Sequence, residues 1–174
     1  MNRLLLLSDR LDRFTNRAGL LTIWLSLFLV IVIIADVIIR YLTSQTAAWI
    51  PELEWHLFAL LFLLGAGYTH QADRHVRVDI FYSGLSPRKK ALVNTLGTFL
   101  LLLPFCVLVV VTSIPFIHAS WSLGETSPDP GGLPARWLIK SAIPAGFMLL
   151  FIAGLSSGLR SLYTLLTGKA AHDH

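Results

Sequence analysis

Ionisable side chains at the ends of long apolar stretches are the residues of this 174-residue chain that could support chemistry. Asp36 and Arg40 are four positions apart, the spacing at which a carboxylate and a guanidinium pair on one helix face. An ionisable group at membrane depth is a candidate functional site by default, because burying a charge in lipid is costly. The simpler interpretation, which we favour, is an internally satisfied pair near the membrane surface, or a pair that also contacts a neighbouring subunit.

A second polar group begins the next apolar stretch. Pro51 suits the first position of a helix, and Glu52 and Glu54 then fall in its first turn, where the helix dipole stabilises carboxylates. His56 follows Glu52 by four positions, so these two side chains can also share a helix face. Because only 57–69 of this stretch is wholly free of charge, its polar end needs partners.

Histidine spacing allows one cofactor-binding alternative. His56 and His118 both fall near the outer ends of predicted spans and could ligate one b-type haem. His56 and His70 are 14 positions apart on one helix and could place ligands at two depths, but His70 has no histidine partner at its own level. A lone membrane histidine is more often a hydrogen-bonded structural residue. We therefore predict no cofactor and keep a haem-binding membrane anchor as the alternative.

Motifs for enzymatic catalysis are missing from the sequence. It has no Gly-rich phosphate-binding loop, no HExxH, and no convincing Ser/His/Asp or Cys/His arrangement. The single cysteine, Cys106, excludes an intrachain disulfide or a cysteine metal cluster. We predict that the protein is not an enzyme and has no catalytic, cofactor-binding or metal-binding residues. The net charge of +4 does not indicate nucleic-acid binding, because the basic residues lie at the ends of apolar segments, as in membrane proteins.

Four apolar segments must position these residues. They cover about 19–39, 51–69, 91–117 and 141–163, and 55% of the chain is hydrophobic against 14% charged. A hydrocarbon core of ~30 Å requires about 20 helical residues, and the backbone has no water partner there. The runs are continuous rather than alternating, which indicates helices. We predict an all-α membrane protein, with a single membrane domain over 1–174 and connectors too short for a soluble domain.

Basic residues are distributed unevenly between the two sides of these four spans. Eleven of the fourteen Lys and Arg residues lie in the N-terminal arm, the second connector and the tail, and three lie in the first and third connectors. Because cytoplasmic segments carry the excess of Lys and Arg, both termini are predicted to be cytoplasmic. The first and third connectors then face outward.

Residues 1–17 are predicted to form a short amphipathic helix that lies in the membrane interface. Three leucines and Phe14 recur at helical spacing there, while charged residues fill the other faces. The alternative is a cytoplasmic continuation of the first span. Residues 164–174 are predicted to be a solvated tail.

Aromatic and basic residues near the span ends are predicted to anchor the chain at the two lipid interfaces. These anchors are Trp49, Trp55, Trp121, Trp137, Arg88, Lys89 and Lys90. The small residue Gly65 permits close contact between helices. The densest charged cluster, 73–79, is predicted at the inner membrane surface, and it lacks the spacing of a catalytic site.

The spans contain few of the polar groups that a solute pathway needs, such as buried donors, ion ligands or broken helices. Asp36 is the only acid well inside a span. Three classes of function remain: an accessory subunit that packs against a larger membrane protein, a haem anchor, or a small channel made by oligomerisation. The shortage of polar residues along the spans argues against the channel and favours the accessory subunit.

Several sequence pieces, in their order and spacing, resemble the small membrane subunit (the Q, or small permease, component) of tripartite ATP-independent periplasmic (TRAP) transporters. These pieces are Arg40-Tyr41, 49–58, Leu64-Gly65-Ala66, 75–79, 124–128 and 143–147. The resemblance covers nearly the whole chain.

That resemblance implies a division of labour between subunits. A large partner subunit binds sodium and the substrate, usually an organic acid, and moves by an elevator-like mechanism, while the small subunit extends the static scaffold beside it. A periplasmic binding protein delivers the substrate at the bacterial inner membrane, and the sodium gradient drives transport. Sodium coupling is therefore expected in the large subunit, and the expected partners are these two proteins and membrane lipids.

Candidate contact residues follow from this division of labour. Charged or small residues near the span ends are predicted to contact the large subunit, and the turn-rich outer connector is predicted to dock the binding protein. The subunit-contact candidates are Asp36, Arg40, Glu52, Glu54, His56, Gly65 and Asp79. The docking candidates are Gly124, Glu125 and Thr126.

Overall fold

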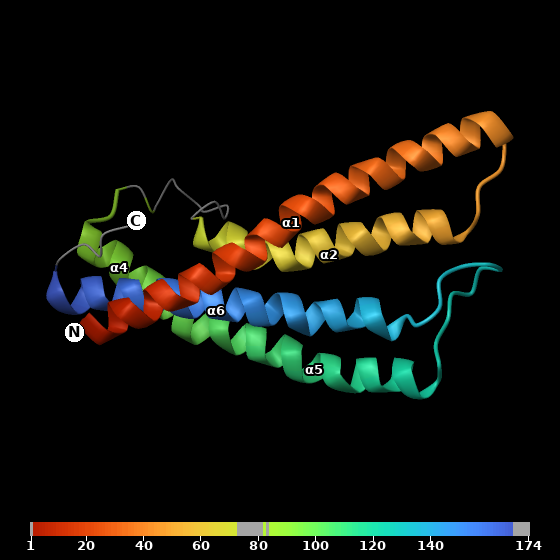
Figure 1. The fold of residues 1–174 in the computed structure, drawn as a ribbon. Coiled ribbons are helices and arrows are strands. Elements are labelled where there is room, and N and C mark those ends of the chain that lie inside the picture. The colour runs from red at the N-terminus through yellow and green to blue at the C-terminus, as the bar shows by residue number, and fades with distance from the viewer. Residues whose placement is uncertain (1, 73–81, 83, 169–174) are drawn as a thin grey trace.

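The computed structural model describes residues 2–72, 82 and 84–168, and these residues form helices joined by short connectors, with no strand among them (Figure 1). The helices are α1 (Asn2–Thr43), α2 (Trp49–Gln71), α4 (Pro87–Leu96), the π-helix η1 (Gly97–Leu102), α5 (Leu103–Ser122) and α6 (Trp137–Thr167). The predicted all-α fold is confirmed for this part of the chain.

Within the described residues, four helical segments are long and apolar enough to cross a membrane. They are Leu4–Thr43, Trp49–Gln71, Pro87–Ser122 and Trp137–Thr167. Each contains one predicted span and extends beyond it, because the helical backbone continues into the polar residues at the ends. Many large apolar side chains on these helices are exposed in the isolated chain, as expected for helices that face lipid or another subunit.

The first helix is longer than a single span requires. α1 has 42 residues, which corresponds to about 63 Å, roughly twice the thickness of the hydrocarbon core. The residues predicted as a separate amphipathic arm are therefore the first turns of α1, and the expected break before the first span is absent. Gly19 lies inside α1 where this helix packs on α2, and a Cβ atom at this position would collide with the Tyr68 ring. The position of these first turns relative to the membrane surface stays a prediction.

The third span contains the π-helical segment η1, which ends two residues before Pro104. Proline has no N–H, and its ring displaces the carbonyl group four positions earlier, which here belongs to Leu100 within η1. The helix widens at this point and then continues as α5 past Pro115 to Ser122. Pro104 therefore perturbs the span without breaking it.

α6 lies at the centre of the bundle. It packs against α1, α2, α4 and α5, while α1 and α2 also pack on each other (Figure 1). The connectors 44–48 and 123–136 lie at one end of the bundle, which we call the connector end. The start of α1 and the end of α6 lie together at the opposite end, which we call the terminal end.

Glycines allow α6 to approach its neighbours closely. A Cβ atom on Gly146 would lie 2.6 Å from the carbonyl oxygen of Leu63 in α2, and Gly67 of α2 lies against the α6 backbone in the same way. Gly154 and Gly158, which form a small-xxx-small pair, face the side chains of the η1 segment. The close contacts of α6 therefore depend on positions without a side chain.

Alanine at Gly146 is expected to lower the free energy of unfolding by about 2 kcal/mol, because the added methyl group meets backbone rather than a movable side chain. Gly97→Ala is the matched control, since a Cβ atom there meets nothing within 4 Å, and its effect should stay within about 0.5 kcal/mol. Unfolding in detergent, followed by circular dichroism, measures both. Equal destabilisation would contradict the close packing of α2 on α6.

Candidate functional site

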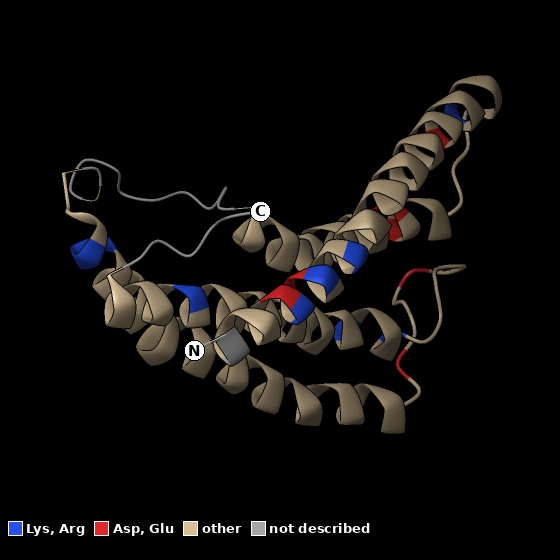
Figure 2. Cartoon of the chain, turned by 60° about the vertical axis from the view of Figure 1, so that its left-hand side comes forward, with Lys and Arg blue, Asp and Glu red and all other residues tan. Residues whose placement is uncertain are grey.

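The charged residues of the described part of the chain lie in the connectors and toward the ends of α1, α2, α4 and α6, while α5 carries no Lys, Arg, Asp or Glu along its length (Figure 2). The ends of the helices are therefore the places where the structure concentrates its polar chemistry. Because each end joins different helices, we describe them separately.

Glu52 of α2 organises the connector end. Glu52 is only 6% exposed. Its carboxylate accepts hydrogen bonds from the Leu133 N–H at 2.6 Å, from Arg136 Nη2 at 3.0 Å and from the Ser127 hydroxyl. The contact with Arg136 is also an ion pair. Three donors from the α5–α6 connector thus converge on one carboxylate of another helix.

Hydrogen bonds within the connector 123–136 shape it into turns that surround the Glu52 carboxylate. The Ser127 N–H donates to the Leu133 carbonyl at 3.1 Å, and the Gly132 N–H donates to the Asp129 carbonyl at 3.0 Å. A Cβ atom on Gly132 would lie 2.9 Å from Glu52 Oε2, so a side chain there would collide with the carboxylate. The turn-forming residues of this connector therefore bring its backbone donors to α2.

The three predicted docking residues lie on the same connector. Gly124 adopts a φ of +57°, which favours glycine, and Thr126 is exposed. Glu125 forms an ion pair with Lys140 of α6, whose ammonium group lies 4.0 Å from the centroid of the Phe116 ring. The Lys140 hydrogen bond lowers the pKa of Glu125. Glu125 therefore attaches the connector to α6, and a role in docking stays a prediction.

The contribution of Glu125 is expected to be lost in acid. Its folded-state pKa lies below its ordinary value of 4.5, so the stabilisation is present above about pH 4.5 and disappears as the pH falls through the folded-state pKa. Amide exchange of 123–136, corrected for the intrinsic rate and followed downward from neutral pH, should show increased opening in acid. Glu125→Gln should show a smaller increase, since the Glu52 carboxylate still holds the connector in this variant, and the same pH response in both proteins would contradict the prediction.

Asp36 and Arg40 form the predicted ion pair within the last turns of α1. Asp36 is only 2% exposed, and it also accepts a hydrogen bond at 3.0 Å from the Thr46 hydroxyl of the α1–α2 connector. The preferred interpretation of an internally satisfied pair is thus confirmed. A further contact of this pair with another subunit stays a prediction.

Glu54 and His56, which follow Glu52 on α2, have different surroundings. His56 Nδ1 faces the backbone carbonyl of Glu52, and its ring lies beside that of Trp55. Glu54 is partly buried, and its Oε1 atom is buried without a hydrogen-bond partner in the described part of the chain. Glu54 is therefore the acid of this helix end that has no partner within 2–72, 82 and 84–168.

The haem alternative receives no support from these surroundings. His56 contacts its own helix, and His118 lies exposed on α5. His70 contacts the Ser157 hydroxyl at 3.0 Å. Over the residues that the structure describes, no group of three His, Cys, Asp or Glu side chains could hold a metal ion.

A polar network at the terminal end was not predicted from the sequence. Arg160 of α6 forms ion pairs with Asp9, through its Nη2 atom at 2.9 Å, and with Asp12. Its Nε atom donates to the Ser8 hydroxyl at 2.7 Å, and the hydroxyl groups of Ser8 and Ser156 are also 2.7 Å apart. Both serines are almost fully buried. We call these five residues the Arg160 network.

The Arg160 network attaches the first turns of α1 to the core of the chain. Asp12 also accepts a hydrogen bond at 2.6 Å from Ser156, and its backbone carbonyl accepts one at 3.2 Å from the Gln71 side chain of α2. A sequence signal existed: Ser8 and Asp12 are four positions apart, as are Ser156 and Arg160, so each pair lies on one helix face. The signal was missed because the arm was interpreted as a lipid-facing helix.

The predicted interface anchors fall at both ends. Trp121 and Trp137 are at the connector end, with ring centroids 4.5 Å apart, and the Arg136 guanidinium lies 5.7 Å from the Trp55 ring centroid. Trp49 begins α2 at the same end. The basic anchors Arg88, Lys89 and Lys90 occupy the first turn of α4. Contact of these residues with lipid stays a prediction.

The two remaining candidates for subunit contact are Gly65 and Asp79. Gly65 of α2 lies toward Thr22 of α1, whose methyl group is 4.0 Å from the position of a Cβ atom on Gly65. Gly65 thus faces α1 within the chain, and its contact with another subunit stays a prediction. Asp79 and the rest of the charged cluster 73–79 lie outside the described residues.

These features define a class of protein: a multi-pass helical membrane protein whose polar groups join helix ends. The comparison with known families agrees with this class. Residues 29–164 match the family described as tripartite ATP-independent periplasmic transporters, DctQ component. No curated protein matches the chain. Because the matched region covers more than half of the sequence, the chain belongs to the DctQ family of small membrane subunits of TRAP transporters.

Membership of this family establishes the coarse function. The chain is a multi-pass inner-membrane component of a transport system, and its family is one of transporter components rather than enzymes. The system is tripartite, so it includes a large membrane subunit and a periplasmic binding protein. The resemblance found in the sequence is thereby confirmed at the level of the family.

Proposed function

We propose that the chain is a static scaffold subunit of a sodium-driven importer of an organic acid or a related solute. In this proposal it packs against the large membrane subunit, which binds both the substrate and sodium. The periplasmic binding protein delivers the substrate to the connector end. Membership of the DctQ family is the observation that carries the proposal.

The use of polar groups within the chain supports a scaffold role. A pathway for a charged solute needs buried donors, ion ligands or broken helices. Here the buried acids Asp36 and Glu52 are both engaged by the chain itself: Asp36 pairs with Arg40 within α1 and accepts from Thr46 of the α1–α2 connector, and Glu52 pairs with Arg136 of the α5–α6 connector. The irregular segment η1 consists of glycine, threonine, phenylalanine and leucine residues. These groups hold the fold together, which leaves solute binding to the partner subunit.

The connector end is the proposed docking side for the binding protein. The distribution of Lys and Arg favours cytoplasmic termini, which would place this end at the periplasm. The connector 123–136 rests on Glu52 and Lys140, so it offers a surface of defined shape around Gly124 and Thr126. A connector held in this way loses little conformational entropy when a partner binds.

Reconstitution of the three components tests this function. The chain, the large membrane subunit of its transport system and the binding protein are combined in liposomes with an inward sodium gradient, and uptake of candidate organic acids is measured. Uptake should require all three components and collapse when the sodium gradient is removed. Equal uptake without this chain, or uptake by this chain alone, would contradict the scaffold role.

A further inference from the structure

Glu54 is set apart from the other span-end acids by its lack of a partner. Asp36 is paired with Arg40, and Glu52 is paired with Arg136. No hydrogen bond or ion pair reaches Glu54 from the described residues, and its Oε1 atom is buried. A partly buried carboxylate without a donor is unfavourable near a membrane interface, because desolvation penalises the charge that no partner offsets.

A stripe of exposed aromatic side chains runs beside Glu54 along α2. Trp55, Phe58 and Phe62 follow each other at helical spacing, and they are 42%, 60% and 71% exposed. Leu57, on the opposite side of this helix, is buried at 6%. The stripe therefore faces away from the chain, and Glu54 lies at its edge one turn before Phe58.

We propose that this surface, which consists of Glu54, Trp55, Phe58 and Phe62, receives a helix of the large membrane subunit that carries an Arg or Lys side chain opposite Glu54. The inference rests on the proposed function and adds to it the surface and the chemistry of the contact. Aromatic residues form the centres of protein interfaces, and a cation supplies what Glu54 lacks. Arg136 does not fill this role, although it lies near Trp55, because its guanidinium is paired with Glu52.

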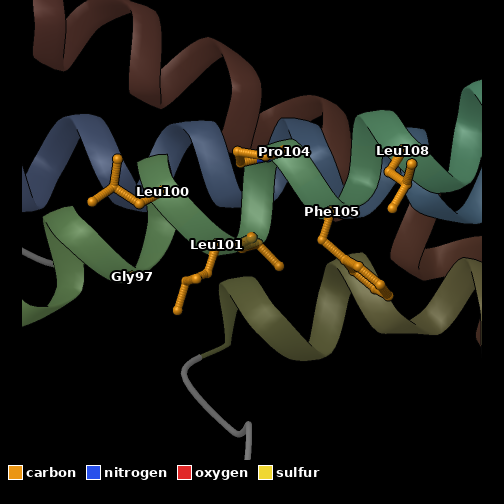
Figure 3. Close-up of a pocket in the computed structure, with 7 residues that line it drawn as sticks. Gly97, Leu100, Leu101, Pro104, Phe105 and Leu108 are labelled. Carbon is orange, nitrogen blue, oxygen red and sulfur yellow. The ribbon is translucent and has the colours of Figure 1, made fainter.

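Another exposed apolar surface lacks this complementarity. A shallow groove at η1 and the start of α5 is lined by Gly97, Leu100, Leu101, Pro104, Phe105 and Leu108 (Figure 3). Its lining contains no charged side chain that would select a protein partner over lipid. Leu101 is 71% exposed, the same as Phe62, so this groove provides a matched control.

Site-specific photo-crosslinking in the intact complex tests the proposal. A photoreactive phenylalanine analogue is placed at Phe58, Phe62 or Leu101, the chain is co-expressed with the large membrane subunit, and membranes are irradiated. Adducts with the large subunit are expected from positions 58 and 62 and not from position 101. Because all three side chains are exposed in the isolated chain, incorporation leaves the internal network around Glu52 intact.

Substitutions that change the charge at position 54 test the role of Glu54 in the same co-expression experiment. Glu54→Gln should reduce the large subunit recovered with the chain by about tenfold or more, Glu54→Lys should reduce it further, and Glu54→Asp should retain part of it. Asp129→Asn is the control, because it removes another acid of the connector end that lies exposed and away from this surface, and it should leave recovery unchanged. Equal recovery with Glu54→Gln and Asp129→Asn would overturn the assignment of Glu54.

The outcomes separate the docking surface from the proposed function. If the wild-type chain does not co-purify with the large subunit, both the surface and the scaffold role fail. If it co-purifies but crosslinks from position 101 and not from 58 or 62, or equally from all three, only the surface is wrong. Adducts confined to positions 58 and 62 support it.

Discussion

Arg160→Met is expected to lower the free energy of unfolding by about 3 kcal/mol, because it leaves carboxylates and buried hydroxyl groups without their donor. Asp12 accounts for most of this loss, since its side chain is 15% exposed, whereas Asp9 is 49% exposed and its pair is screened by solvent. Arg160 also binds the buried Ser8 hydroxyl. The first turns of α1 should therefore separate from α6 while the rest of the bundle remains helical.

Two measurements check this expectation. Unfolding in detergent gives the free energy, and a Thr15→Cys reporter gives the local opening, because Thr15 is 1% exposed and its hydroxyl donates to the Leu11 carbonyl of the same helix. The single native cysteine, Cys106, is fully buried, so its labelling background is low. Maleimide should label position 15 slowly in the otherwise native chain and much faster in Arg160→Met.

Arg88→Met is the matched control for the same substitution. Arg88 is exposed in the first turn of α4, so its loss should change stability by no more than about 0.5 kcal/mol and leave labelling at position 15 unchanged. If Arg160→Met behaves like Arg88→Met, the Arg160 network does not attach α1 to α6.

Glu52→Gln is expected to release the connector 123–136 from α2 at a cost of about 3 kcal/mol. The substitution removes the charge opposite Arg136 and presents an amide group to donors that need an acceptor, including the Leu133 N–H. At 1.4 kcal/mol for each factor of ten, the Leu133 amide should exchange about 100-fold faster. Hydrogen–deuterium exchange with mass spectrometry measures this rate.

The control is Glu125→Gln in the same connector. Its carboxylate is more exposed than that of Glu52 and pairs with Lys140 rather than with the Leu133 N–H, so near-neutral exchange at Leu133 should change far less. Exchange in the middle of α5 should stay unchanged in both variants. A similar acceleration at Leu133 in the two variants would show that Glu52 is not the centre of the connector end.

Separation along the chain explains which contacts could be predicted. Asp36 and Arg40 lie on one helix four residues apart, so helix geometry alone brings them together. Glu52 was interpreted with His56 on the same reasoning, but its carboxylate binds Arg136 from a distant segment, and His56 reaches only a backbone carbonyl. Arg136 reaches Glu52 because of the relative position of α2 and α6. The close glycine contacts between these two helices fix that position.

The first turns of α1 illustrate a different limit. An amphipathic pattern shows that one face of a helix avoids water, but it does not distinguish lipid from another helix. Ser8 and Thr15 are buried at 0% and 1%, so part of this segment packs within the chain. The contact of this segment with α6 could have been predicted from the polar residues on its packed face, but not from its leucines.

The sequence by itself determined that the described residues contain four helices long and apolar enough to cross a membrane, where their apolar parts lie, and to which family the chain is similar. These properties depend on the transfer of each segment into a hydrocarbon layer of known thickness, which is a local quantity. Only the tertiary structure decided that Glu52 binds Arg136, that Arg160 holds the start of α1, and that Glu54 has no partner among the described residues. Pairing requires two helices in a particular register, and that register follows from packing between residues far apart in the chain.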